Sequence, residues 1–194
     1  MIVIFEGLDN CGKTTLVSLL YDYYVKKGIA VEMSKEFETN IGIELKNMAK
    51  SGNLDSVIKS FLFATDRYIR MKNMNFNDNT IILFDRYVPS AIAYRMAEGI
   101  DKEWISALNS IFPKADIGFY IDISGEKSVS RNSDEKFNIK ASKEHLNDVR
   151  NAYLSILEEN NLIYIDGNQP QQIIFEQVVE KINEVRKTDV QKIR

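Results

Sequence analysis

The segment GLDNCGKTT (7–15) constrains the fold more than any other part of the chain. It lies between the apolar run IVIFE (2–6) and a segment of helical period that continues to Lys27. The residues that match the phosphate-binding pattern G-x-x-x-x-G-K-[ST] are Gly7, Gly12, Lys13 and Thr14. Glycine lets backbone N–H groups turn toward a phosphate without obstruction, and the helix that follows points its positive end at the same anion. The pattern therefore predicts a strand, a phosphate-binding loop and a helix in direct succession.

Four further short apolar runs predict buried strands, because each is nearly continuous, as in a parallel sheet that is covered on both faces. They are AVEMS (30–34), TIILFD (80–85), IGFYIDI (117–123) and LIYID (162–166). Segments of helical period separate them, at 41–50, 54–76, 88–99, 101–111, 140–160 and 170–187. This alternation predicts an α/β fold of the P-loop NTPase type, a doubly wound five-stranded parallel sheet flanked by helices. We expect one domain over residues 1–194, with a short, mobile lid in the polar stretch at about 125–140.

Composition excludes several other classes of protein. The chain carries 25 basic and 28 acidic side chains, without a basic stripe, so no nucleic acid is expected as a partner. Its apolar runs are too short to cross a bilayer, so no membrane partner is expected either. The single cysteine, Cys11, excludes an internal disulfide and a thiolate zinc cluster, and the single histidine, His145, excludes a multi-histidine metal site. A cytoplasmic protein is the expectation that remains.

The phosphate-binding loop predicts how a nucleoside triphosphate is held. Lys13 would bridge the β- and γ-phosphates, and the Thr14 hydroxyl would hold Mg²⁺. Asp85 ends the run TIILFD, where a strand opens onto the ligand crevice, and it is the second residue expected at Mg²⁺, through water. The ATP-binding residues predicted from the loop are Gly7, Leu8, Asp9, Asn10, Cys11, Gly12, Lys13, Thr14 and Thr15. A GTPase is not expected, because the guanine-reading pattern N-K-x-D occurs nowhere in the chain.

Arg86 follows Asp85 directly and starts a polar strip. Steps of four residues from Arg86 reach Ser90 and Tyr94, and the three side chains project to roughly the same side if a helix begins near Val88. A guanidinium, a hydroxyl and a phenol in line suggest a surface that contacts a phosphate and the sugar next to it. The alternative is a solvated arginine beside a packed tyrosine.

The segment 54–76 carries an aromatic residue on its polar side. The apolar side, which we expect to face the core, consists of Leu54, Val57, Ile58, Phe61, Leu62, Thr65, Tyr68 and Ile69. Phe63 falls on the opposite side, beside Lys59, Arg67 and Arg70. A nucleobase would explain this placement, with Phe63 stacked on the base and Arg67 donating to a base oxygen. The alternative is a scattered exposed aromatic or a residue of an interface.

Three segments together resemble the thymidylate kinase family in order and spacing: IFEGLDNCGKTT, FLFATDRY and DRYVPSAIAY. The resemblance extends over most of the chain and implies transfer of the γ-phosphoryl group of ATP to dTMP, giving ADP and dTDP, by a homodimer. It implies that Phe63 stacks on thymine and that Arg67 bonds to a thymine carbonyl. It also implies that Tyr94 crowds the 2′ position of the sugar, that Asp9 meets the 3′-hydroxyl and the metal–phosphate region, and that Arg86 grips the acceptor phosphate.

The chain departs from the family pattern at several positions. Position 10 is Asn10 and not arginine, so the phosphate-clamping arginine is expected from the lid, where Arg131 is the only arginine between residues 125 and 140. Lys35 stands where the family has an arginine on the acceptor phosphate. Its ammonium group supplies a point charge, whereas a guanidinium can donate two parallel hydrogen bonds. Ala91 stands where some relatives place a polar residue on the base, so that contact is missing or is replaced by Ser90 or water.

Two other readings of the chain stay open. One is a kinase for another acceptor, such as dUMP or a deoxynucleoside. The other is a non-catalytic or regulatory protein that binds a nucleotide in the same loop. Turnover with an acceptor separates the two kinases from the binding protein, and the identity of the acceptor separates the kinases from each other.

Overall fold

The computed structural model describes the chain except for residues 51–53, 78, 132–141 and 193–194. It contains a five-stranded sheet in the order β2-β3-β1-β4-β5, in which every neighbouring pair is parallel. The strands are β1 (Ile2–Glu6), β2 (Val31–Lys35), β3 (Ile81–Asp85), β4 (Ile117–Asp122) and β5 (Leu162–Asp166). Each of the five apolar runs forms a strand, which confirms the predicted α/β fold.

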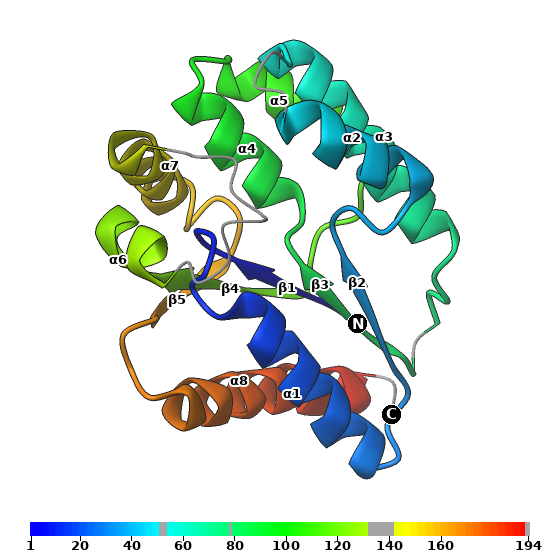
Figure 1. The fold of residues 1–194 in the computed structure, drawn as a ribbon. Helices are drawn as coiled ribbons and strands as arrows, with labels where there is room; N and C mark the ends of the chain where they lie inside the picture. Colours follow the sequence, from blue (N-terminus) through cyan, green and yellow to red (C-terminus); the bar gives the residue numbers. More distant parts are fainter. Residues whose placement is uncertain (51–53, 78, 132–141, 193–194) are drawn as a thin grey trace.

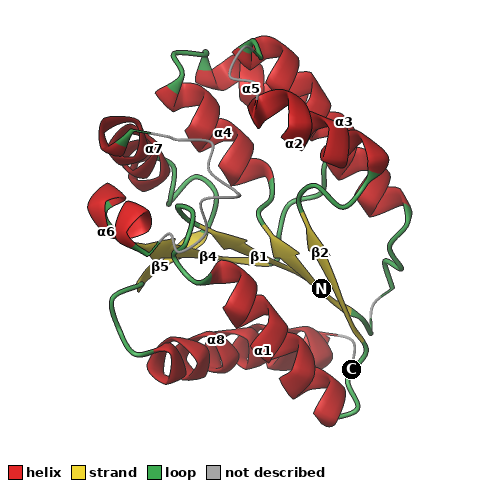
Figure 2. Ribbon diagram, viewed as in Figure 1, coloured by secondary structure: helices red, strands yellow, loops and turns green. Residues whose placement is uncertain are grey.

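Helices cover both faces of the sheet (Figures 1 and 2). The helix that follows the phosphate-binding loop, α1 (Lys13–Lys26), packs beside α8 (Gln171–Lys192) on one face. The remaining helices lie on the other side: α2 (Asn40–Lys50), α3 (Ser56–Lys72), α4 (Val88–Ala97), α5 (Lys102–Leu108), α6 (Gly125–Ser130) and α7 (Lys143–Ser155). Among the helices that the structure describes, none has both the length and the apolarity needed to cross a membrane.

The strand order places β1 at the centre, between β3 and β4. All residues of these three strands are buried, and the rings of Phe5 and Phe119 stack at 5.5 Å between centroids. Gly7 follows β1 with a φ of 138°, and a Cβ there would lie 2.4 Å from the carbonyl oxygen of Ile121. Only glycine fits this position. The chain is thereby able to turn sharply at the carboxyl edge of the sheet, where parallel α/β sheets bind their ligands.

The predicted lid differs from the expectation over its first part. Residues 125–130 form the short helix α6 and not a loop. The Ser124 side chain accepts a hydrogen bond from the Lys127 N–H at 3.2 Å, and the Asn147 side chain of α7 accepts one from the Gly125 N–H at 3.1 Å. These caps stabilise a helix that the polar composition did not reveal. The remainder of the predicted lid, from residue 132 onward, lies outside the described residues.

The helix α3 is oriented opposite to the expectation. Its apolar side was predicted to face the core, but Ile58, Phe61 and Tyr68 are 49%, 52% and 49% exposed. The buried side chains are Ser60, Asp66, Arg67, Arg70 and Met71. The prediction of a core-facing apolar stripe is therefore wrong, and the polar side of α3 faces the interior of the molecule.

Candidate active site

The loop between β1 and α1 is shaped to receive an anion. Gly12 is the N-cap of α1, with a φ of 104°, and Asn10 also has a left-handed backbone, with a φ of 60°. The buried Lys13 Nζ donates to the carbonyl oxygens of Gly7 at 3.0 Å and Leu8 at 2.7 Å. The ammonium group is thus held inside the loop, where the phosphates of a nucleotide would lie. Cys11 is buried in the same loop, as a small packing residue would be.

Thr14 and Asp85 meet across the carboxyl edge of the sheet. The Thr14 hydroxyl donates to the Asp85 carboxylate at 2.5 Å, and Asp85 is only 4% exposed. A hydroxyl and a carboxylate are the oxygen ligands that Mg²⁺ prefers. Within the described part of the chain, three acidic, histidine or cysteine side chains do not gather anywhere to hold a metal ion. The pair therefore fits an ion that takes its other ligands from phosphates and water.

Arg86 lies at the centre of the polar strip that the sequence predicts. Its guanidinium donates to the hydroxyls of Ser90 at 3.3 Å and Tyr94 at 3.2 Å, and to the Asp9 carboxylate at 2.5 Å. Loss of surrounding water raises the pKa of Asp9, but the positive charges of Arg86 and Lys13 outweigh this effect and lower the pKa. Arg86 therefore joins Ser90, Tyr94 and the phosphate-binding loop.

A buried network below Arg86 fixes the strip. Ser90 is 4% exposed, and its hydroxyl bonds to the Glu6 carboxylate and, at 2.7 Å, to the Tyr153 hydroxyl. Tyr153 also donates to Glu6 at 3.0 Å, and the backbone N–H of Tyr87 donates to Glu6 at 2.9 Å. The Ser90 hydroxyl is therefore already bonded to Glu6, Tyr153 and Arg86. Glu6 was absent from the predicted site, although a carboxylate that ends an otherwise apolar strand could have indicated it.

Arg67 lies on the buried side of α3, and Phe63, one turn before it, is half-buried. Arg67 is fully buried, and its Nη atoms donate to the Asn109 side chain at 2.7 Å and to the Tyr87 carbonyl at 3.0 Å. Its Nε has no hydrogen-bond partner among the described residues. Burial lowers the pKa of Arg67. The ring of Phe63 lies 5.6 Å from that of Phe37, which the sequence did not indicate.

The segment that follows β2 brings negative charge to this site. Lys35 ends β2, pairs in register with Asp85 and is exposed. The next side chain, Glu36, is 9% exposed, with a carboxylate oxygen 3.9 Å from the Arg86 Nε. Burial raises the pKa of Glu36, while Arg86, Arg67 and Arg70 oppose that rise. The sequence did not predict this carboxylate among arginines, because Arg67, Arg70 and Arg86 come from elements distant in sequence from Glu36.

Arg131 lies on the other side of the phosphate-binding loop. It is the C-cap of α6, and its guanidinium donates to the carbonyl oxygens of Asn10 at 3.4 Å and Gly167 at 3.2 Å. A cavity of about 300 Å³ lies beside it. The residues around this cavity include Gly12, Thr15, Leu16, Arg131, Gln171 and Ile174. The Ser128 hydroxyl of α6 also donates to the Asp9 carbonyl at 2.8 Å, so α6 supports the loop directly.

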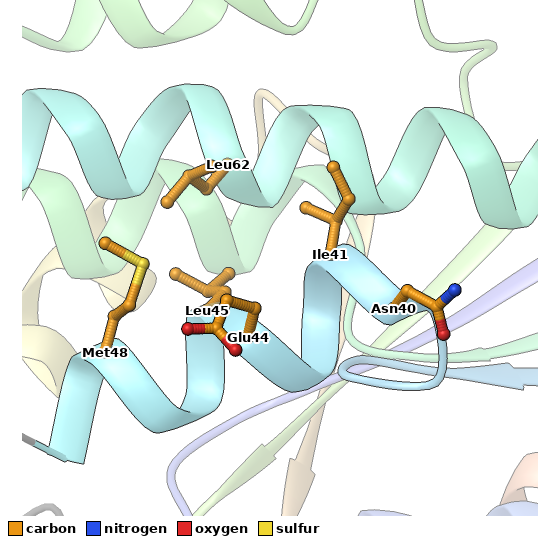
Figure 3. A pocket seen from close by; sticks show the side chains of 6 residues that line it. All are labelled: Asn40, Ile41, Glu44, Leu45, Met48 and Leu62. Carbon is orange, nitrogen blue, oxygen red and sulfur yellow. The ribbon is translucent and has the colours of Figure 1, made fainter.

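A second cavity of similar volume lies away from the loop, between α2 and α3 (Figure 3). Ile41, Leu45, Met48 and Leu62 give it an apolar lining, and Asn40 and Glu44 lie at its edge. It holds neither the cations nor the backbone turn that phosphate binding requires, so it is not part of the nucleotide site.

A phosphate-binding loop that faces an arginine–aromatic cluster across one edge of a parallel sheet defines a P-loop nucleotide kinase. The family model for thymidylate kinase matches residues 5–181. The chain belongs to the thymidylate kinase family and is a nucleoside-monophosphate kinase.

The relatives most like the chain include archaeal proteins described as probable thymidylate kinases. The protein from Sulfurisphaera tokodaii is 36% identical over 93% of this chain and 94% of its own length. Probable thymidylate kinase 1 from Saccharolobus solfataricus is 34% identical over 93% of this chain and 96% of its own length. The Sulfolobus acidocaldarius protein is 35% identical over 84% of this chain and 86% of its own length.

Proposed function

We propose that the chain phosphorylates dTMP to dTDP with ATP and Mg²⁺, in a single domain that holds both nucleotides. The observation that carries the proposal is the contact of Arg86 with Asp9 at 2.5 Å. The contact joins Arg86, the residue proposed for the acceptor phosphate, to Asp9 of the loop proposed for the donor phosphates, which supports the proposal. A phosphoryl group could then pass between the two nucleotides over a short, aligned path. Because both are nucleotides of the cell interior, we propose the cytoplasm as the place of the reaction.

Charge neutralisation and alignment account for the catalysis. The acceptor is a phosphate oxygen that is already ionised at neutral pH, so no general base is needed. Lys13 holds the β- and γ-phosphates, Arg86 holds the acceptor phosphate, and Arg131 lies on the donor side of the loop. Thr14 and, through water, Asp85 would hold Mg²⁺, which would supply positive charge to the donor phosphates. Asp9 keeps Arg86 oriented and receives the 3′-hydroxyl of the acceptor, while Lys35 adds positive charge at the rim of the site.

The base and the sugar are recognised by α3 and α4. Phe63 stacks on thymine, and the unpaired Nε of Arg67 is the donor available to a thymine carbonyl. Tyr94 lies beside Arg86, next to the phosphate, where it can crowd the 2′ position of the sugar. Ser90 contributes by holding Arg86, because its hydroxyl is already bonded to Glu6 and Tyr153.

A coupled assay of ADP release tests the proposal. The purified protein is given ATP and Mg²⁺ with dTMP, dUMP, UMP, dCMP or thymidine in turn. We expect dTMP to support the fastest release, and Lys13→Met to slow that release at least about tenfold. Faster turnover of another acceptor would assign a different kinase, and ADP release that no acceptor stimulates would indicate a nucleotide-binding protein without transferase activity.

We also propose that two copies of the chain associate through α2, α3 and α5. Ile43 of α2 and Phe61 of α3 are 51% and 52% exposed, and the Phe61 ring lies 5.7 Å from that of Trp104 on α5. The apolar cavity between α2 and α3 opens on the same helices (Figure 3). Exposed apolar side chains on neighbouring helices are typical of a protein–protein interface.

Sedimentation analysis tests this association. We expect the wild-type chain to sediment as a dimer and Phe61→Glu to sediment as a monomer. Val25→Glu is the matched control, since Val25 is 50% exposed on α1, on the far face of the sheet. A wild-type monomer, or a Phe61→Glu variant that stays dimeric, would contradict the proposed surface.

A further inference from the structure

Arg95 is a buried cation that no part of the proposed mechanism uses. It lies on α4, four residues after Ala91, so the two side chains project from the same side of the helix. Arg95 is 5% exposed, and its guanidinium carbon lies 5.9 Å from the centre of the Phe63 ring on the adjacent helix α3. A charge so deeply buried requires a reason, because removal from water destabilises it strongly.

Its protein partners leave donor capacity unused. Arg95 Nη1 lies 3.0 Å from a Glu98 oxygen, but it is not aligned for a hydrogen bond to any described residue. Glu98 is shared, because it also accepts from Lys59 at 3.2 Å and from the Ser56 hydroxyl. Burial lowers the pKa of Arg95, and Glu98 and Glu36 oppose that decrease. The guanidinium therefore stays charged and keeps N–H groups that protein atoms do not fully occupy.

We propose that Arg95 donates a hydrogen bond to a ring carbonyl of the acceptor base, as a second base-reading residue beside Arg67. The inference rests on the proposed function, because it places a pyrimidine on Phe63. Ala91 has no polar atom for the base, and the Ser90 hydroxyl is bonded to Glu6 and Tyr153. Arg95 is then the polar side chain of α4 that lies against the stacking ring. A guanidinium only donates, so it suits thymine and uracil, which have carbonyl oxygens at both C2 and C4.

Arg95→Met tests the inference, because methionine keeps most of the volume and removes every donor. We expect the KM for dTMP to rise about tenfold or more, the loss usual for a hydrogen bond from a charged group, while the KM for ATP changes by less than about twofold. Arg186→Met is the matched control, since Arg186 also lies over an aromatic ring, that of Tyr24, at 5.8 Å on the far face of the sheet. It should leave both constants unchanged. Arg95→Leu replaces the methionine variant if that variant does not fold.

Thio-substituted acceptors distinguish a bond to the base from simple packing against Phe63. Sulfur in place of O2 or O4 of dTMP weakens hydrogen-bond acceptance at one position. With wild-type protein, we expect one of these analogues to have a KM several-fold or more above that of dTMP. With Arg95→Met, the KM of that analogue should differ little from its value with wild-type protein. The inference would be overturned if Arg95→Met raised the KM of dTMP and of both analogues by the same factor, or left the KM for dTMP unchanged. If wild-type protein does not phosphorylate dTMP at all, it is the proposed function that fails.

Discussion

Arg86 combines a functional side chain with a strained backbone, and two substitutions separate these properties. Its φ is 72°, a conformation that is unfavourable by about 1–2 kcal/mol for residues other than glycine. Arg86→Ala and Arg86→Gly both remove the guanidinium, and with it the contacts to Asp9, Ser90 and Tyr94. Only glycine relieves the backbone, and the greater entropy of its unfolded chain offsets part of that gain. We therefore expect Arg86→Gly to be more stable than Arg86→Ala by about 1 kcal/mol.

Thermal denaturation measures this difference, which corresponds to about 2–4 °C in Tm for a domain of this size. Both variants should lose at least about a hundredfold in kcat/KM for dTMP, because each loses charged hydrogen bonds to the acceptor phosphate. The same two substitutions at Arg186, within α8, serve as the control. There the order should reverse, with glycine less stable than alanine by about 1 kcal/mol. Equal Tm values at position 86, or a more stable alanine variant, would refute the argument from backbone strain.

Three further predictions concern the donor loop, the base and the acid stability. Lys13→Met and Arg131→Ala should each lower kcat by at least about tenfold with little change in Tm, and full turnover of the second variant would remove Arg131 from the site. Phe63→Ala should raise the KM for dTMP much more than the KM for ATP; equal increases would remove Phe63 from the base site. Asp122 is buried, which raises its pKa, but hydrogen bonds from Arg150, Tyr164 and Tyr120 outweigh this and lower the pKa. The charged Asp122 therefore stabilises the fold above its unfolded pKa of about 3.9, and this stabilisation is lost as the pH falls through the lower folded pKa. Asp122→Asn should have a lower Tm than the wild type at neutral pH, and the difference should shrink between about pH 5 and pH 3. A deficit that stays constant over this range would contradict the pairing.

The sequence was sufficient for the sheet and for the phosphate-binding loop. The five strands are short and nearly continuous in apolar residues, and each was predicted to within two residues of its observed ends. Burial was predicted correctly for β1, β3 and β4, but the edge strands β2 and β5 are only partly buried. The loop needs glycine at Gly7 and Gly12 for its backbone geometry, since both residues have positive φ values. Such local patterns can be predicted from the sequence because the residues that carry the pattern are the same residues that form the strand or the turn.

The orientation of α3 could not be obtained in the same way. Its periodicity separates an apolar from a polar side, but it does not specify what each side meets. The apolar side remains exposed in the single chain, whereas Arg67 and Arg70 are buried through partners distant in sequence, such as Asn109 and Ser34. These partners come from other elements and carry no signal within α3. A rule that places apolar side chains in the core therefore fails for a helix that lies between a polar ligand site and an unpaired surface.

Backbone strain gathers at the same edge of the sheet as the ligand groups. Within the described part of the chain, Asn10, Phe37, Arg86 and Asn161 are the non-glycine residues with positive φ, and the first three belong to the site. Asparagine tolerates this conformation, but phenylalanine and arginine do so at a cost of about 1–3 kcal/mol each. Phe37 is held against Phe63, and Arg86 is held by Asp9 and Ser90, so the contacts that form the site also maintain the strain. An alanine substitution that removes such a contact should leave the strain in place, because alanine also disfavours a positive φ, whereas glycine should recover part of the lost stability. Binding of the acceptor should lose the full interaction in both cases.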